Sequence, residues 1–177
     1  MIEMETRRYP VDTQSFNVVR DGGYLYVDKT EMVFKMTHEL RYAFLSRPRR
    51  FGKSMLCSTL EAYFNGRKDM FKGLKIEGLE TEWTKYPVIK LSFASAKNVT
   101  EKSINEIINS LLSDNEEIFG LKKADKDNGV RLKNLIKQGL RPRIQHIRPR
   151  LPKRRNQDFD GVGFQPIFVQ ISGHRAD

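Results

Sequence analysis

The chain has 177 residues and a formal net charge of +10, so it is long enough for one domain with a buried core. Its charged fraction of 31% and the absence of any long apolar tract exclude a membrane span. A single cysteine, Cys57, excludes an internal disulfide and fits a reducing compartment, and the N-terminus has no apolar region typical of a signal peptide. We therefore expect a cytoplasmic protein.

The first quarter of the chain predicts an extended arm, a strand and a helix. Residues 8–16 read as an arm because Pro10 fixes φ and disfavours helix before it. The sequence predicts a strand at 24–27 and a helix at 29–40. Asp28 is placed to cap that helix, with Glu31 completing a capping box.

Strands and helices continue to alternate as far as residue 138. Strands are predicted at 42–46 and 87–93, and a helix at 52–64 is expected to end at Asn65 and Gly66. Thr100 is expected to cap a helix that runs to about Phe119, and a further helical pattern covers 130–138. This alternation predicts an α/β fold with a parallel sheet.

The composition changes at Gly139. Residues 139–177 carry eight basic and three acidic side chains, whereas residues 1–138 carry 24 and 19. Each part has a net charge of +5, and four of the seven prolines lie in the shorter part. Because proline interrupts every helical pattern there, we expect an N-terminal domain at 1–138 and a poorly ordered basic tail at 139–177.

One segment indicates a chemistry. Gly52, Lys53 and Ser54 lie between the strand predicted at 42–46 and the following helix. This arrangement offers backbone N–H groups, a positive helix end, a lysine and a hydroxyl to a triphosphate and its Mg²⁺. Arg47 stands where the general pattern has glycine, so a basic surface loop before an ordinary helix is the alternative.

Four segments of the chain together resemble a known family. They are residues 24–30 (YLYVDKT), 42–54 (YAFLSRPRRFGKS), 58–64 (STLEAYF) and 70–74 (MFKGL). In this order and spacing they resemble the N-terminal part, about residues 9–138, of the AAA-ATPase-like family of bacterial P-loop ATP-binding proteins. Longer members of that family carry a C-terminal PD-(D/E)XK nuclease-like domain. The resemblance implies an incomplete, three-layer P-loop NTPase-type domain, and it accounts for Arg47, because the family's loop normally reads RPRRFGKS.

The resemblance also implies which residues would bind ATP. Lys53 would contact the β- and γ-phosphates, Ser54 would bind Mg²⁺, and the backbone of residues 50–53 would surround the phosphates. The three arginines of the loop either hold phosphate or brace the loop. The implied nucleotide-binding set is Arg47, Arg49, Arg50, Phe51, Gly52, Lys53 and Ser54.

A second motif of the family contains Tyr26, Asp28 and Lys29. These residues either line the nucleotide pocket or are structural. For Asp28, the role of helix cap is the alternative to nucleotide contact.

The tail departs from the family. A P-loop ATPase needs an acidic residue, from the Walker B strand, to hold Mg²⁺ through water. In the family that strand follows the helix ending near Gln138 and closes with an Asp-Glu pair, which the basic tail replaces here. We therefore expect a truncated domain that binds ATP with little or no hydrolysis, and a tail that arose by a shifted reading frame or a fusion. The alternatives are non-specific nucleic-acid binding through the tail, or a non-functional gene remnant.

Overall fold

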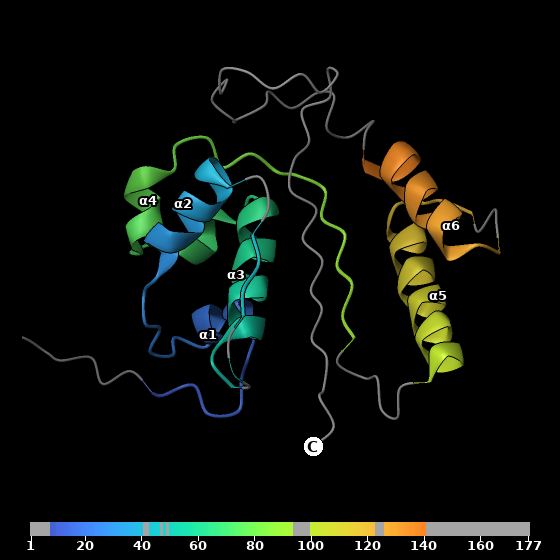
Figure 1. Ribbon diagram of the computed structural model, residues 1–177. Helices are drawn as coiled ribbons and strands as arrows, with labels where there is room; N and C mark the ends of the chain where they lie inside the picture. Colours follow the sequence, from blue (N-terminus) through green and yellow to red (C-terminus); the bar gives the residue numbers. More distant parts are fainter. Residues whose placement is uncertain are drawn as a thin grey trace, which may run out of the picture. The chain divides into compact units, whose positions relative to one another are not determined.

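The computed structural model describes residues 8–40, 43–46, 48, 50–93, 100–122 and 126–140 (Figure 1). The described residues up to Lys85 belong to one compact unit and those from Tyr86 onward to a second. Described helices account for the regular structure of both units. None of these helices is both long enough and apolar enough to cross a membrane.

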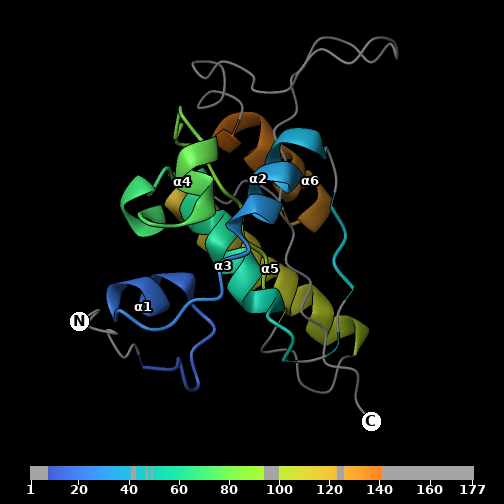
Figure 2. The same ribbon diagram turned by 90° about the vertical axis from the view of Figure 1, so that its left-hand side faces the viewer.

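The first unit is built from four short helices. They are α1 (Phe16–Asp21), α2 (Thr30–Glu39), α3 (Lys53–Phe64) and α4 (Lys75–Leu79), with a 3₁₀ turn at Lys68–Phe71. Helix α1 packs on α3, and α2 packs on α4 (Figures 1 and 2). Five apolar side chains that are almost fully buried fill its core: Phe16, Val19, Tyr63, Phe71 and Ile76.

Helix α1 occupies the end of the predicted arm and the residues after it. The Phe16 N–H donates to the Ser58 hydroxyl at 2.9 Å, which joins the start of α1 to α3. The Phe16 ring lies 4.9 Å from the Phe71 ring and 5.2 Å from the Tyr26 ring. These contacts show why a segment of only six residues is helical: tertiary packing supplies the stability that so short a helix lacks in isolation.

Helices α2 and α3 confirm the predicted helical segments, with one correction at the start of α2. The cap position is Lys29, and Glu31 makes an ion pair with Lys35 at 2.7 Å. The expected capping box between Asp28 and Glu31 is therefore wrong. Helix α3 ends as predicted, because Gly66 has a φ of 67° and its N–H donates to the Tyr63 carbonyl.

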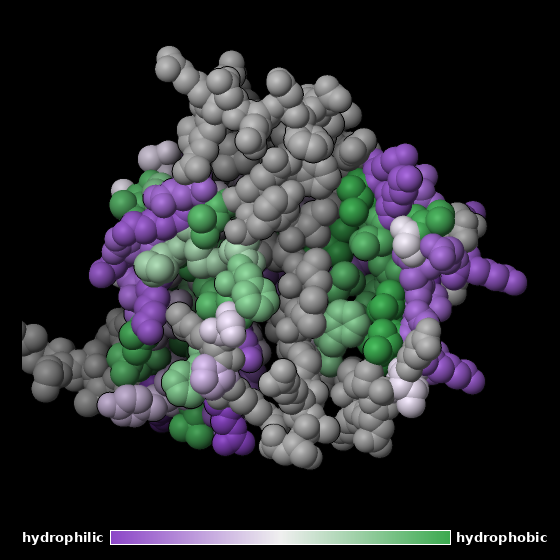
Figure 3. Space-filling model, in the orientation of Figure 1, coloured by the Kyte–Doolittle hydropathy of each residue, from purple (hydrophilic) through white to green (hydrophobic). Residues whose placement is uncertain are grey.

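The second unit contains α5 (Glu101–Ile118) and α6 (Asn128–Asn134), which continues as a π-helical turn at Leu135–Leu140. Thr100 caps α5 as predicted: its hydroxyl accepts the Ser103 N–H at 3.2 Å. Apolar residues gather on one side of α5 and α6 and hydrophilic residues on the other (Figure 3). The buried members of this apolar cluster are Ile89, Leu91, Leu112, Phe119 and Leu135.

A buried ion pair joins α6 to α5. Arg131 is only 1% exposed, and its guanidinium donates to both carboxylate oxygens of Glu116 at 2.6 and 3.0 Å. It also donates to the Ser113 hydroxyl at 2.9 Å and to the side-chain oxygen of Asn109. The hydrogen bond to Glu116 raises the pKa of Arg131, although burial acts in the opposite direction. All four hydrogen bonds of the guanidinium thus go to one neighbouring helix, α5.

The predicted α/β fold is wrong, because no strand is present in the residues that the structure describes. Residues 24–27, 43–46 and 87–93 have no regular structure, so no sheet and no three-layer P-loop architecture is seen. Apolar runs predict burial, but a strand also needs a neighbour for its backbone groups. Segment 87–93 instead packs on α5, where the Asn115 side-chain amide accepts from Lys90 N–H and donates to Lys90 C=O at 3.4 and 3.1 Å.

Candidate nucleotide-binding loop

The chain bends sharply just before α3. Arg50 and Gly52 both have left-handed backbones, with φ values of 67° and 75°. A left-handed conformation costs a non-glycine residue roughly 1 to 2 kcal/mol, so Arg50 is strained. The two left-handed residues flank Phe51 and lead directly into Lys53, the first residue of the helix.

Gly52 is needed for its backbone angle and not for space. A Cβ atom at this position would meet no heavy atom within 4 Å. Any residue other than glycine, or to a lesser degree asparagine, would nevertheless strain the main chain at this φ. The glycine therefore sets the direction in which α3 begins.

The start of α3 offers backbone donors. The Leu56 N–H donates to the Gly52 carbonyl at 2.9 Å. Within the described part of the chain, the N–H groups of Ser54 and Met55 have no acceptor, no side chain caps the helix, and its first turn has no acidic residue. These donors and the helix dipole favour an anion at this end of α3.

The side chains of the loop differ in exposure. Arg50 and Phe51 are exposed, whereas Lys53 and Ser54 are half-buried at the start of α3. Arg47 and Arg49 lie outside the described residues. The structure therefore brings Arg50, Phe51, Gly52, Lys53 and Ser54 together in one turn, and it does not test their contacts with a ligand.

A protein family described as "Predicted AAA-ATPase" has a sequence model that matches residues 10–147. The chain belongs to this AAA-ATPase-like family. It is 34% identical over 137 residues to a protein from Azotobacter chroococcum mcd 1, described as "Uncharacterized protein in vnfD 5'region". The alignment covers 76% of this chain and 26% of that relative, so the chain spans about a quarter of the relative's length. No solved structure matches the chain.

The match confirms the resemblance and extends it past the change in composition at Gly139. The first residues of the basic tail, 139–147, fall within the match, and residues 148–177 lie beyond it. The tail beyond residue 140 lies outside the described residues. The boundary at 138, the poor order of the tail and its origin by frameshift or fusion therefore stay predictions.

Tyr26, from the second motif of this AAA-ATPase-like chain, packs on α3. Its ring contacts Phe16 of α1, and its hydroxyl lies beside the Thr59 side chain of α3. Burial raises the pKa of the Tyr26 phenol and outweighs the opposing effect of the Thr59 side chain. Thr59 lies five residues beyond Ser54, or about 8 Å along the helix axis. The described neighbours of Tyr26 are thus Phe16 of α1 and Thr59 in the body of α3.

Asp28 joins the starts of two helices. One of its oxygens accepts from the N–H and the hydroxyl of Thr30 at 2.8 and 2.7 Å, and the other accepts from the Lys75 N–H at 2.7 Å. Burial raises the pKa of the Asp28 carboxyl, but the hydrogen bonds from Thr30 and Lys75 outweigh burial, so the pKa is lowered overall. These contacts favour the structural role of Asp28. Lys29 beside it is exposed.

Sequence reasoning missed Thr30, which is fully buried. Its hydroxyl accepts the Ile76 N–H at 3.1 Å, so Thr30 and Asp28 together cap the first turn of α4. The available signal was the pair of polar side chains at the start of a helix, but their partners lie more than 40 positions later. Sequence alone identifies such a pair as a cap of its own helix.

Proposed function

We propose that this chain binds ATP with Mg²⁺ through the loop at residues 47–54. The observation that carries the proposal is the uncapped, positive start of α3 directly after the left-handed Gly52. Membership of a family of predicted AAA-ATPases supports a nucleotide as the anion. The triphosphate would accept from the N–H groups at the start of the helix.

Each loop residue has a proposed role. Lys53 contacts the β- and γ-phosphates, and the Ser54 hydroxyl binds the Mg²⁺, which adds positive charge between the phosphates. The N–H groups of Ser54 and Met55 donate to phosphate oxygens. Arg47, Arg49 and Arg50 add charge to the loop.

We further propose that this chain hydrolyses ATP slowly or not at all. Hydrolysis in P-loop proteins needs carboxylates that position Mg²⁺ and water. Among the buried or half-buried carboxylates with described partners, Asp28 binds the start of α4, Glu80 the Tyr63 hydroxyl and Glu116 Arg131.

A titration tests the binding proposal. A fluorescent ATP analogue with Mg²⁺ is added to the wild type, to Lys53→Ala and to Lys102→Ala, which removes an exposed lysine from α5. We expect at least tenfold weaker binding for Lys53→Ala only, because a lysine that contacts phosphate through a charged hydrogen bond contributes about 1.5 to 3 kcal/mol. Equal affinity of the wild type and Lys53→Ala would remove the proposal. Phosphate release from ATP, measured on the same samples, tests slow hydrolysis.

The basic tail supports a separate proposal, non-specific binding of nucleic acid by residues 139–177. That segment holds half of the net charge in less than a quarter of the chain. Phosphate neutralisation by arginine gives an affinity that falls steeply with salt. Deletion of residues 139–177 is expected to abolish this salt-dependent binding and to leave the affinity for ATP unchanged. Unchanged DNA affinity after the deletion would contradict it.

A further inference from the structure

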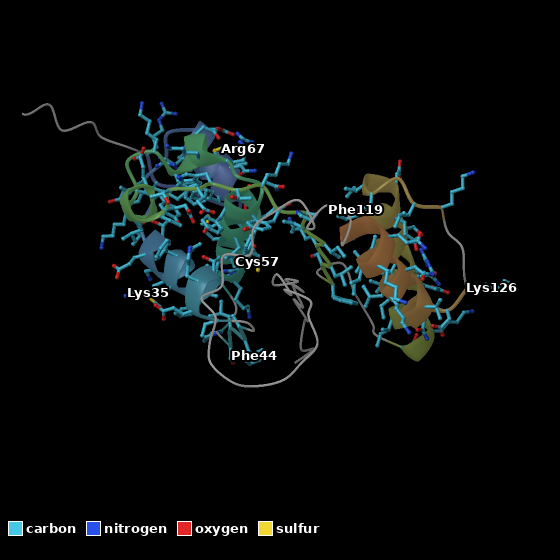
Figure 4. All side chains as sticks on the ribbon, turned by 90° about the horizontal axis from the view of Figure 1, so that it is seen from above. Lys35, Phe44, Cys57, Arg67, Phe119 and Lys126 are labelled. Carbon is cyan, nitrogen blue, oxygen red and sulfur yellow. The ribbon has the colours of Figure 1, made fainter. Side chains whose placement is uncertain are left out.

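Two phenylalanines near the candidate loop are exposed. Phe44 is 93% exposed and Phe51 is 63% exposed, whereas Phe16 and Phe71 of the same unit are fully buried. Figure 4 shows Phe44 at the margin of the first unit, away from the labelled Cys57 of α3. Aromatic side chains normally contribute most of their apolar surface to a core or an interface. Two that do neither within the described residues leave their rings exposed for contact with another molecule.

Charge indicates the chemistry of that molecule. Residues 43–54 contain four basic side chains and no acidic one. Arg50 and Lys53, the described members of this set, lie on either side of Phe51 in the sequence. The cores of protein interfaces are depleted in charged residues, whereas single-stranded nucleic acids are bound by aromatic side chains interleaved with basic ones. A polyanion with aromatic rings fits both features of the surface.

We propose that Phe44, Arg50, Phe51 and Lys53 form a binding surface for single-stranded nucleic acid. The two phenylalanines stack on bases, and the two basic side chains contact the phosphates. Positions 44 and 51 are at most about 25 Å apart along an extended chain, so a short oligonucleotide reaches both. A duplex is a poorer ligand because its bases are already stacked on one another. This proposal does not rest on ATP binding, but it shares Arg50, Phe51 and Lys53 with the proposed ATP site, so the two ligands would compete for the loop.

The test compares two oligomers of equal charge. The full chain is titrated with fluorescently labelled dT12 and with an abasic 12-mer, which has the same phosphates but no bases. The basic tail contacts phosphates in both oligomers, so only base stacking separates them. We expect the wild type to bind dT12 at least fivefold more tightly than the abasic 12-mer. In Phe44→Ser the ratio of the two affinities should fall by about fivefold or more. The abasic 12-mer should bind the wild type and Phe44→Ser equally.

A matched control and three contrary outcomes complete the design. Tyr9, which is 74% exposed, is an aromatic side chain outside the surface, so Tyr9→Ser should leave dT12 affinity unchanged. Equal binding of the two oligomers by the wild type would overturn the proposal. A preference for dT12 that Phe44→Ser leaves intact would also overturn it. If Phe44→Ser weakened binding to phosphatidylcholine vesicles but not to dT12, the proposal would be overturned in favour of a lipid surface.

The same variants separate this proposal from ATP binding. Phe44 is not among the proposed nucleotide contacts, so Phe44→Ser should bind the ATP analogue as the wild type does. If Lys53→Ala binds the analogue normally while dT12 preference still depends on Phe44, the ATP proposal fails alone. If Lys53→Ala loses the analogue and dT12 shows no preference, the nucleic-acid proposal fails alone. Circular dichroism confirms that each variant remains folded.

Discussion

Replacement of Asp28 decides between its structural role and nucleotide contact. Its carboxylate accepts the first-turn N–H groups of both α2 and α4, at Thr30 and Lys75. The loss of one capping interaction costs about 0.5 to 2 kcal/mol. Two such losses, partly compensated by water, predict that Asp28→Ala lowers the free energy of unfolding by about 2 kcal/mol. Because whole domains are stable by only about 5 to 15 kcal/mol, urea denaturation followed by circular dichroism measures this readily.

The chemistry of the side chain gives a graded series. Asp28→Asn keeps one oxygen for Thr30 but places an amide donor toward the Lys75 N–H, so we expect about half the loss. Asp69 is the matched control: it is an exposed aspartate paired with Arg67 at 2.9 Å, and its replacement by Ala should change nothing measurable. A variant Asp28→Ala of normal stability but weakened ATP affinity would refute the structural role.

The pH dependence of Asp28 has a definite sign. The pKa of its carboxyl is lowered in the folded protein, so its contribution is complete above the pKa of the unfolded chain. It is lost as the pH falls through the folded pKa. The stability difference between the wild type and Asp28→Asn should therefore be constant near neutral pH and shrink below about pH 4. A difference that grows with acidification would contradict the assigned hydrogen bonds.

Three further predictions concern the ion pair, the loop and the tail. Arg131→Ala leaves Glu116 buried without its partner and should cost about 3 to 5 kcal/mol in urea denaturation, whereas Lys133→Ala on the exposed side of α6 should cost little. Gly52→Ala strains a left-handed residue by roughly 1 kcal/mol and should lower the affinity for the ATP analogue about fivefold. Gly52→Asn should lower that affinity less. Equal effects of the two substitutions at Gly52 would show that its φ is unimportant. If the tail is a frameshift, sequencing of the gene beyond codon 138 should find the family's Asp-Glu pair in another frame, and its absence from both other frames would exclude that origin.

Helices were predictable from the sequence where local signals agree. Apolar spacing after the cap residue Thr100 identified α5 to within about a residue. Apolar spacing before Gly66 did the same for α3. The capping box at Asp28 was wrong because Glu31 pairs with Lys35, and one oxygen of Asp28 accepts from the Lys75 N–H, 47 positions later. No local pattern contains that information.

The sequence wrongly predicted a sheet because an apolar run indicates burial but does not specify what the segment packs against. No strand is present in the described residues. Ile89 and Leu91 are buried, as their pattern indicates, but they pack in a cluster with helix residues such as Leu112. The backbone of Lys90 between them pairs with the side chain of Asn115. A side-chain amide offers both N–H donors and a carbonyl acceptor, as a backbone unit of a neighbouring strand offers one of each, so it satisfies the backbone of Lys90 without a ladder.

The candidate loop was predictable in part. The sequence placed Gly52, Lys53 and Ser54 at the start of a helix, which the structure begins at Lys53, but it did not predict the left-handed conformations of Arg50 and Gly52. Likewise, the sequence shows an aromatic residue at position 44 and cannot show that it is exposed. Exposure depends on whether the rest of the fold covers a side chain, which is a property of tertiary packing.

The two family motifs meet at helix α3, and this indicates how the second acts on the first. The Phe16 N–H donates to the Ser58 hydroxyl, and the Tyr26 hydroxyl lies beside the next residue, Thr59. The Thr59 hydroxyl donates in turn to the Met55 carbonyl at 2.8 Å, one residue beyond Ser54. Contacts from two other segments therefore hold the first turns of α3 and fix where its N–H groups point. If the loop binds phosphate, Tyr26 contributes by holding this helix in place, and Tyr26→Phe should lower affinity only as far as it lowers the stability of the first unit.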